Sequence, residues 1–226
     1  ELYMITQPSP PEFSVAPGTY QVRQAVELIA ANEDERIYYT LDGSEPTEEA
    51  QNYTEPIILP NGITVIKAFV KNSRGYTSEV VTAEYNMDIE LREVSFQDFY
   101  IESIVRQELE LSYYSPIYNE DVERITSLTI VGNNIIDSDY RDTVYFYEDR
   151  YSVYGYTDQA TGYVTSLTDL DKFIFLKELN IAYQDNLDLT GIDRCKNLEE
   201  LSLINNGISN VEAIGRLTSL RKLCLA

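Results

Sequence analysis

The side chains of this sequence that could carry out acid–base or metal chemistry are almost all carboxylates. The chain of 226 residues has 38 Asp and Glu, 17 Lys and Arg, and no His. Without His there is no Ser–His or Cys–His nucleophile pair, and most zinc and copper sites are excluded. Two carboxylates at a fixed separation could cleave a glycosidic bond, but no pair stands out among so many acids. We therefore expect no catalytic residue, no metal ligand, no cofactor and no enzymatic activity in this chain.

The charge balance restricts the possible partners. The formal net charge is -21 at pH 7, which repels phosphate backbones and anionic lipid surfaces. We expect no nucleic-acid partner. We also expect no membrane insertion, because no apolar run reaches about 18 residues. The first residue is Glu1 rather than Met, so we expect a trimmed N-terminus that carries no record of a targeting signal.

Residues 10–86, which follow a tail of residues 1–9, have the pattern of short strands separated by turns. Residues 36–41 (RIYYTL) alternate with a period of two, and residues 63–70 (ITVIKAFV) are rich in β-branched side chains. Asp42-Gly43 favours a tight turn between them. A last strand is expected at residues 79–85, and the set predicts a small β-sandwich.

A family resemblance accompanies these strands. It is carried by PGTY at 17–20, IYYTLDGSEPT at 37–47, and by segments 53–56, 65–68 and 75–80. They resemble the chitobiase/β-hexosaminidase C-terminal-type domain over nearly the whole module. The resemblance implies an immunoglobulin-like accessory domain of secreted bacterial proteins, without catalytic residues of its own.

Four polar or aromatic residues of this module, Tyr38, Tyr39, Asp42 and Thr47, have two interpretations. They could form a sugar-binding surface. Alternatively, Tyr39 belongs to the core, and Asp42 and Thr47 hold a turn through hydrogen bonds from side chain to backbone. The second interpretation is favoured.

The rest of the chain contains an internal repeat. Leu179, Leu201 and Leu223 are spaced by 22 residues (201 − 179), and five further apolar columns keep that spacing. The columns are Leu176, Leu198, Leu220; Ile181, Leu203, Leu225; Leu167, Leu189, Val211; Leu170, Ile192, Ile214; and Phe173, Cys195, Leu217. Such a period predicts stacked units, each burying its apolar face on its neighbours.

The pattern L-x-x-L-x-L-x-x-N-x-I, with Asn206 at the Asn position, is that of a leucine-rich repeat and resembles the internalin-like class. The resemblance implies a solenoid that presents a concave sheet of exposed strand positions. At its Asn position, Asn206 can bridge backbone groups of neighbouring repeats. Cys195 falls in a core column and is expected to be buried.

An earlier, degenerate repeat begins at Ile125 and includes Asn133, but the pattern resumes only at Leu167. An insertion at about residues 138–166 separates them, and its segments 143–147 and 151–156 could pair as a hairpin. It offers either an aromatic binding surface or a hairpin packed on the solenoid flank. The candidate surface residues are Tyr145, Tyr147, Tyr151, Tyr154 and Tyr156.

Residues 95–111 are expected to form a helix that covers the edge of the first repeat, within a linker and cap at 87–124. Ser95 is the predicted N-cap, with Asp98 in the capping-box position. Phe96, Ile101 and Val105 are expected in the core. The F-x-D and E-x-x-x-R pattern is similar to caps of leucine-rich-repeat proteins from Gram-positive bacteria.

The concave face of the repeats, 125–226, is the predicted binding surface for an unknown protein or glycan. Its candidate residues are Glu178, Asn180, Ala182, Tyr183, Glu200, Ser202, Ile204 and Lys222. The chain stops just after a repeat strand, so we expect a truncated solenoid. Its open edge, or the outward-facing thiol of Cys224, could associate an otherwise monomeric chain artificially.

The fold class expected is multidomain: an all-β immunoglobulin-like sandwich, then an α/β leucine-rich-repeat solenoid with an N-terminal helical cap. The function expected is non-catalytic recognition or adhesion, extracellular or at the surface of a Gram-positive-type bacterium. The alternatives are an accessory carbohydrate-binding region of a larger glycan-degrading enzyme, and a spacer.

Overall fold

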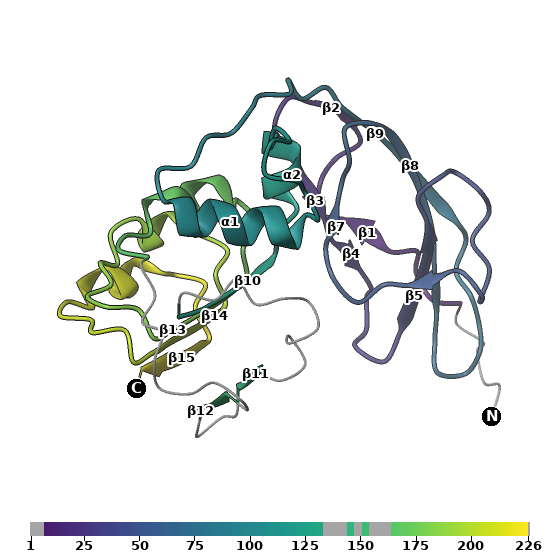
Figure 1. Ribbon diagram of the computed structural model, residues 1–226. Coiled ribbons are helices and arrows are strands. Elements are labelled where there is room, and N and C mark those ends of the chain that lie inside the picture. Colours follow the sequence, from purple (N-terminus) through teal and green to yellow (C-terminus); the bar gives the residue numbers. More distant parts are fainter. Residues whose placement is uncertain (1–6, 133–143, 147–150, 154–163, 226) are drawn as a thin grey trace. The chain divides into compact units, whose positions relative to one another are not determined.

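The computed structural model describes residues 7–132, 144–146, 151–153 and 164–225 of the chain. It divides into two compact units, unit 1 (Glu1–Glu90) and unit 2 (Leu91–Ala226) (Figure 1). Within the described residues, no helix has the length and apolar character needed to cross a membrane.

Unit 1 is built from strands alone in its described part. A five-stranded sheet has the order β2-β9-β8-β5-β6, and two further pairs are β1-β4 and β3-β7. The strands are β1 (Glu12–Phe13), β2 (Gly18–Tyr20), β3 (Ala25–Val26), β4 (Leu28–Ile29), β5 (Arg36–Thr40), β6 (Gln51–Asn52), β7 (Ile57–Ile58), β8 (Gly62–Lys71) and β9 (Val81–Met87). This all-β arrangement is compatible with the predicted immunoglobulin-like sandwich.

The long strand β8 organises the core of unit 1. Its β-branched residues alternate, so that Ile66, Ala68 and Val70 are fully buried on one face. Tyr85 of β9 is buried beside them, and its hydroxyl donates to the Val15 carbonyl at 2.8 Å. Burial therefore raises the pKa of Tyr85 to about 12.

The last strand of unit 1 begins two residues later than predicted from the 79–85 pattern. Ser78 donates its N–H to the Val70 carbonyl at 2.8 Å, and its Oγ accepts from the Val70 N–H at 2.8 Å. These bonds close the turn between the strands, and the β8–β9 ladder starts at the pair Ala68–Val81. A local side-chain bond thus displaces the strand start.

Unit 2 alternates strands with short helices. Its helices are α1 (Phe99–Glu108) and α2 (Asn119–Glu123), and the 3-10 helices are η2 (Thr168–Lys172), η3 (Ile192–Arg194) and η4 (Glu212–Arg216). Its strands are β10 (Ser127–Val131), β11 (Val144–Phe146), β12 (Tyr151–Val153), β13 (Glu178–Ala182), β14 (Glu200–Ile204) and β15 (Lys222–Leu225).

The main sheet of unit 2 is parallel, in the order β10-β13-β14-β15. Leu179 pairs with Leu201, and Leu201 pairs with Leu223, so the 22-residue spacing of the sequence is the register of the sheet. A 3-10 helix separates each of the last three strands from the strand before it. Residues of one column, such as Phe173 and Cys195, stack on one another in one buried core.

Unit 2 from β10 onward forms a coil of stacked turns, each made of one strand of the parallel sheet and the chain that leads to it. The last turn of this coil, which contains η4 and β15, is the most exposed. Val211, predicted in a core column, keeps 50% of its surface exposed, and Leu223 and Leu225 keep 47% each. Each turn buries its columns only where another turn stacks on it, and the described chain places none after β15. The equivalent residues Leu167 and Leu189 are buried because they have a neighbour on both sides.

Helix α1 starts later than predicted. Asp98, not Ser95, is the N-cap, and its Oδ1 accepts from the N–H groups of Tyr100 and Ile101. Ile101 and Val105 are fully buried as expected, and Phe96 packs partly buried against the same core. Phe99, the first residue of α1, is 56% exposed.

The predicted tyrosine-rich insertion is described only in part. β11 and β12 pair antiparallel, with Tyr145 opposite Ser152 and Phe146 opposite Tyr151, as the predicted hairpin requires. Tyr147, Tyr154 and Tyr156 lie outside the described residues. The side chains of Tyr145 and Tyr151 are outside them too, so the candidate aromatic surface stays a prediction.

Candidate functional site

The polar residues of the IYYTLDGSEPT segment hold a turn after β5. The Oδ1 atom of Asp42 accepts from Ser44 Oγ at 2.6 Å and from Ser44 N at 3.0 Å. Thr40 Oγ1 donates to the Ser44 carbonyl at 2.6 Å. Gly43 takes φ +78° and donates to the Val65 carbonyl at 2.9 Å. The hydrogen bonds from the Ser44 side chain and backbone lower the pKa of Asp42, whose carboxylate is thus used locally.

The other residues of this segment divide between core and surface. Thr47 Oγ1 accepts from Glu49 N at 3.3 Å, and Tyr39 packs partly buried against the core, with its ring 6.3 Å from Tyr53. Tyr39 thus belongs to the core, and Asp42 and Thr47 hold turns through hydrogen bonds from side chain to backbone, as the favoured interpretation expected. Tyr38 differs, because its ring stacks on buried Phe69 at 5.4 Å on the opposite face of the sheet.

Salt bridges join the loop after this turn to that opposite face. Lys67 pairs with Glu45, and Lys71 pairs with Glu48. Both lysines lie on β8 beside Phe69, so the aromatic stack is flanked by neutralised charges. Tyr38 is partly exposed on this face, where its ring stacks on Phe69.

The predicted concave surface of unit 2 is smaller than expected. In the sheet register Glu178, Glu200 and Lys222 form one row, with Lys222 Nζ 2.8 Å from Glu200 Oε1. Ser202 and Cys224 follow in the next row. Tyr183 lies just beyond β13 in a left-handed conformation, with φ +59°.

Three of the predicted surface residues are buried instead. Ala182 and Ile204 form an apolar cluster with Val131. Asn180 is buried, and its amide donates to Glu178 Oε1 at 2.7 Å. The expectation that these positions are exposed is therefore wrong. Val131, Ala182 and Ile204 lie side by side in register as an apolar cluster and cover one another, and Asn180 is held by Glu178. Glu178, Glu200, Ser202 and Lys222 are the strand residues that remain on this face.

Asn206 occupies the bridging position predicted for it. Its Oδ1 accepts from Gln184 N at 3.0 Å, and its Nδ2 donates to the Ile181 carbonyl at 2.8 Å, both in the preceding turn. Gln184, one period earlier, donates to the Gly132 carbonyl at 3.0 Å and accepts from Val164 N at 3.1 Å. The sequence analysis missed Gln184, although its place 22 residues before Asn206 was the available signal.

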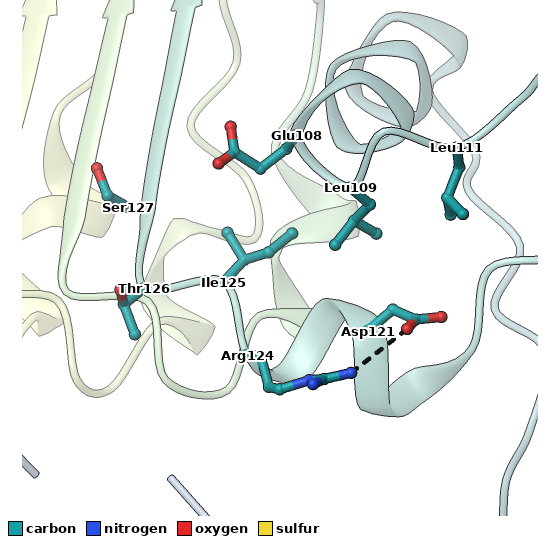
Figure 2. Close-up of a pocket in the computed structure, with 8 residues that line it drawn as sticks. All are labelled: Glu108, Leu109, Leu111, Asp121, Arg124, Ile125, Thr126 and Ser127. Atoms are coloured by element: carbon teal, nitrogen blue, oxygen red, sulfur yellow. Dashed lines mark ion pairs between the residues drawn. The ribbon is translucent and has the colours of Figure 1, made fainter. Parts of the chain in front are cut away.

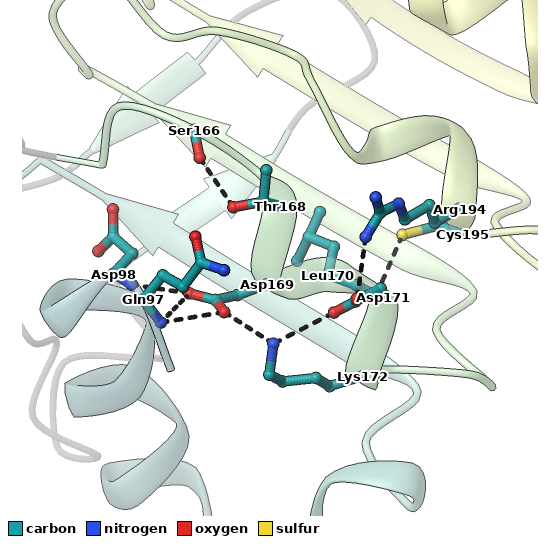
Figure 3. A network of polar contacts seen from close by, with 10 residues as sticks. All are labelled: Gln97, Asp98, Ser166, Thr168, Asp169, Leu170, Asp171, Lys172, Arg194 and Cys195. Atoms are coloured by element: carbon teal, nitrogen blue, oxygen red, sulfur yellow. Dashed lines mark hydrogen bonds and ion pairs between the residues drawn. The ribbon is translucent and has the colours of Figure 1, made fainter. Parts of the chain in front are cut away.

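A buried carboxylate joins the start of α1 to the coil (Figure 3). Asp169 of η2 is 1% exposed and accepts from Gln97 N at 2.9 Å, Asp98 N at 2.8 Å and Lys172 Nζ at 2.8 Å. Burial opposes the charge of Lys172, but hydrogen bonds and attraction from Asp169 and Asp171 outweigh it and raise the lysine pKa. Sequence gave no signal for Asp169, which is one acid among 38.

An open pocket of about 500 Å³ lies where the end of α1, the end of α2 and the start of β10 meet (Figure 2). Arg124 Nη2 lies 3.7 Å from Asp121 Oδ1 there, and the apolar side chains of Leu109 and Ile125 line the same pocket. Across residues 7–132 and 164–225, no three His, Cys, Asp or Glu side chains are grouped so as to hold a metal ion. The pocket is lined by the charged side chains of Glu108, Asp121 and Arg124 and by the apolar side chains of Leu109, Leu111 and Ile125.

The comparison with known families concerns unit 1. Residues 15–82 match the family model of the chitobiase/beta-hexosaminidase C-terminal domain. The matched segment runs from before β2 into β9 and contains the Asp42 turn and the Tyr38–Phe69 stack. No curated protein matches the chain.

The chitobiase-type match fits the geometry of unit 1. Domains of this family are accessory domains of glycan-degrading enzymes rather than catalytic ones. In this chain, Thr40, Asp42 and Thr47 of the matched segment form hydrogen bonds within turns. Glu45 and Glu48 form salt bridges with Lys67 and Lys71. The chitobiase-type domain therefore uses its most distinctive residues to hold its own fold.

Proposed function

We propose that this chain is a non-catalytic accessory region of a larger, extracellular glycan-degrading enzyme. The observation that carries the proposal is the match of residues 15–82 to the chitobiase/beta-hexosaminidase C-terminal domain. The geometry supports it, because Asp42 serves as an acceptor within its own turn.

We further propose that unit 2 is a leucine-rich-repeat coil of the internalin-like type, with α1 as its N-terminal cap. The support is the 22-residue register of its parallel strands and the bridging amide of Asn206. In the accessory role, this coil is a stiff element that holds other parts of the enzyme at a distance.

A second candidate function is recognition or adhesion through the face of that coil. The specific observation in its favour is the row Glu178, Glu200 and Lys222, a charged surface on a rigid parallel sheet. A protein or glycan partner would then be read by these side chains. This candidate predicts that the row is needed for binding.

Turnover tests the non-catalytic claim. The purified chain is incubated with chromogenic N-acetylhexosaminides and with peptidoglycan, and the released chromophore and reducing ends are measured. We expect rates equal to buffer. Hydrolysis that copurifies with the chain and follows its concentration would contradict the proposal.

Charge reversal separates the two candidates. The full chain is tested against chitin oligomers, peptidoglycan fragments and mucin sugars, beside a Glu178→Lys, Glu200→Lys double variant. The accessory role predicts that this variant binds as the wild type does. Binding that disappears in the variant, while its fold is retained, would favour recognition through the coil.

A further inference from the structure

Two tyrosines occupy the tip of a tight turn between α1 and α2. Tyr113 and Tyr114 are the central residues of a turn closed by the Ser115 N–H, which donates to the Ser112 carbonyl at 3.1 Å. Their side chains are 66% and 91% exposed. The two rings meet edge to face, with centroids 5.2 Å apart and planes at 89°. The turn thus displays two aromatic faces to solvent.

A partly buried arginine, Arg106, holds this turn in place. Arg106 Nη1 donates to the Ser112 carbonyl at 3.0 Å and to the Ser115 carbonyl at 2.7 Å, which are the two ends of the turn. Glu102 Oε1 in turn fixes the guanidinium, accepting from Nε at 2.9 Å and from Nη2 at 2.7 Å. The hydroxyls of Ser112 and Ser115 lie 2.8 Å apart. Five polar contacts therefore fix a loop whose tip touches little else.

The end of α1 fixes the entry to the same turn. Leu111 N donates to the Arg106 carbonyl at 2.8 Å, and Glu110 N donates to the Gln107 carbonyl at 3.1 Å. This is a Schellman motif with Glu110 in the left-handed position, at φ +53°. The bonded helix end and the bonded turn together fix the backbone from which the two rings project.

The residue types at this tip contrast with its structure. Turn tips favour Gly, Asn, Asp, Ser and Pro, and large aromatic rings are normally at least half covered. Here the two largest side chains of the loop project into water from a bonded backbone, and each ring contacts the other. Exposed tyrosines serve recognition, because with only two side-chain torsions they give a wide contact area and a hydroxyl at low entropic cost.

We propose that the Tyr113–Tyr114 turn is a saccharide-binding site that takes neutral pyranose rings. Two tyrosine side chains bury about 300–500 Å² together, less than the roughly 800 Å² per partner of a specific protein interface but enough for one or two sugar rings. The net charge of -21 disfavours anionic sugars. The choice of a sugar over a small apolar ligand rests on the accessory function proposed above.

In this site the rings supply stacking and the phenolic hydroxyls supply hydrogen bonds. The perpendicular arrangement lets a pyranose lie flat on one ring while its edge contacts the other. Arg106 acts as a positioning residue, because it holds both ends of the turn and does not itself reach the ligand.

The test is calorimetric titration of the full chain with neutral N-acetylglucosamine oligomers and, for comparison, with a sialylated oligosaccharide. We expect saturable binding of the neutral oligomers and weaker binding of the charged one. Tyr113→Ala and Tyr114→Ala should each weaken the neutral interaction about tenfold or more. Phe99→Ala, which removes another exposed ring of unit 2, should leave the affinity unchanged.

Each outcome decides a separate claim. Wild-type chain that binds no neutral oligomer would overturn this site, and the non-catalytic accessory role would still stand on its turnover test. Binding that both tyrosine variants retain would place the sugar elsewhere and overturn the site alone. Circular dichroism of each variant checks that the fold is intact, which is expected because both side chains are mainly in solvent.

Discussion

Asp169 carries a charge inside unit 2 and connects two distant parts of its chain. Its carboxylate accepts from two backbone N–H groups at residues 97 and 98 and from Lys172. A buried carboxylate with three donors is stabilising only while all three remain, since an uncompensated donor in the interior is costly. The start of α1 is therefore fixed to η2 by this one side chain.

Replacing this carboxylate tests the connection. Asp169→Asn removes the charge and turns one acceptor into a donor, so we expect the free energy of unfolding to fall by about 2–4 kcal/mol. Urea unfolding followed by circular dichroism measures it. Asp171→Asn is the matched control. The Asp171 side chain is 40% exposed and pairs with Lys172 and Arg194, so its replacement should lower the free energy of unfolding by less than about 1 kcal/mol. Equal losses in the two variants would refute the special role of Asp169.

Cys195 makes unit 2 sensitive to alkaline pH. Burial, then the nearby charges of Asp171 and Asp193, raise the pKa of its thiol to about 12 from an ordinary value of 9.0. The folded state therefore favours the protonated thiol, and this stabilisation is complete below pH 9 and lost as pH rises toward 12. The slope is about 1.4 kcal/mol per pH unit.

Unfolding titrations between pH 8 and pH 11 measure this effect. The free energy of unfolding of the wild type should fall more steeply with pH than that of Cys195→Ala, whose side chain cannot ionise. Parallel curves for the two proteins would show that the thiol ionises as easily in the folded chain as in the unfolded one.

These two residues also show what sequence could and could not predict. Cys195 was placed in the core because it shares a 22-residue column with Phe173 and Leu217, and periodicity fixes which side chains stack. Asp169 was missed because its backbone partners lie 71 and 72 residues away, and nothing in residue type marks such a bond. Gln184 was missed because it departs from the Asn of the pattern.

The turn before η3 contains a glycine, Gly191, that packs closely against the backbone of the turn before η2. Gly191 takes φ +101°, and a Cβ there would lie 2.5 Å from the Leu167 carbonyl oxygen. The approach lets the turn before η3 lie directly on the turn before η2. A side chain would have to push apart two backbone segments that the whole stack holds together.

Gly191→Ala should therefore lower the free energy of unfolding by about 3 kcal/mol or more, from strain and overpacking combined. Gly207→Ala is the control, because Gly207 has φ +58° and a nearest atom at 3.0 Å, and it should cost about 1 kcal/mol. Thermal melts of both variants give the order of their stabilities. A Gly207 variant less stable than the Gly191 variant would contradict this account of the stacking.

The elements of the chain were predictable where a period was strong. The strands β5 and β8 and the register of the coil follow from alternation and from the repeat. Element ends were less predictable, because local side-chain bonds set them: Ser78 delays β9, and Asp98 displaces the start of α1. The exposure of strand residues was misjudged at Asn180, Ala182 and Ile204, since a pattern gives the face of a strand but not what packs on that face.

The division of the chain between residues 90 and 91 leads to a prediction for its unfolding. Each unit has its own buried cluster, one around Ile66 and one around Leu179. We expect two calorimetric transitions, and Gly191→Ala should lower only one of them. Limited proteolysis should cut between residues 88 and 92, just after the end of β9. A single transition that shifts as a whole would mean that the units unfold cooperatively.

The proposed function gives this chain a supporting role in glycan degradation, without chemistry of its own. The most direct measurement compares the larger glycan-degrading enzyme that this proposal implies with a form of it from which residues 7–225 of this chain are deleted, on insoluble chitin and on a soluble chromogenic N-acetylhexosaminide. We predict that the deletion lowers the rate on the insoluble polymer several-fold and leaves the rate on the soluble substrate unchanged. Equal rates on the insoluble polymer, or a loss of activity on the soluble substrate by a correctly folded deletion protein, would contradict the proposed accessory function.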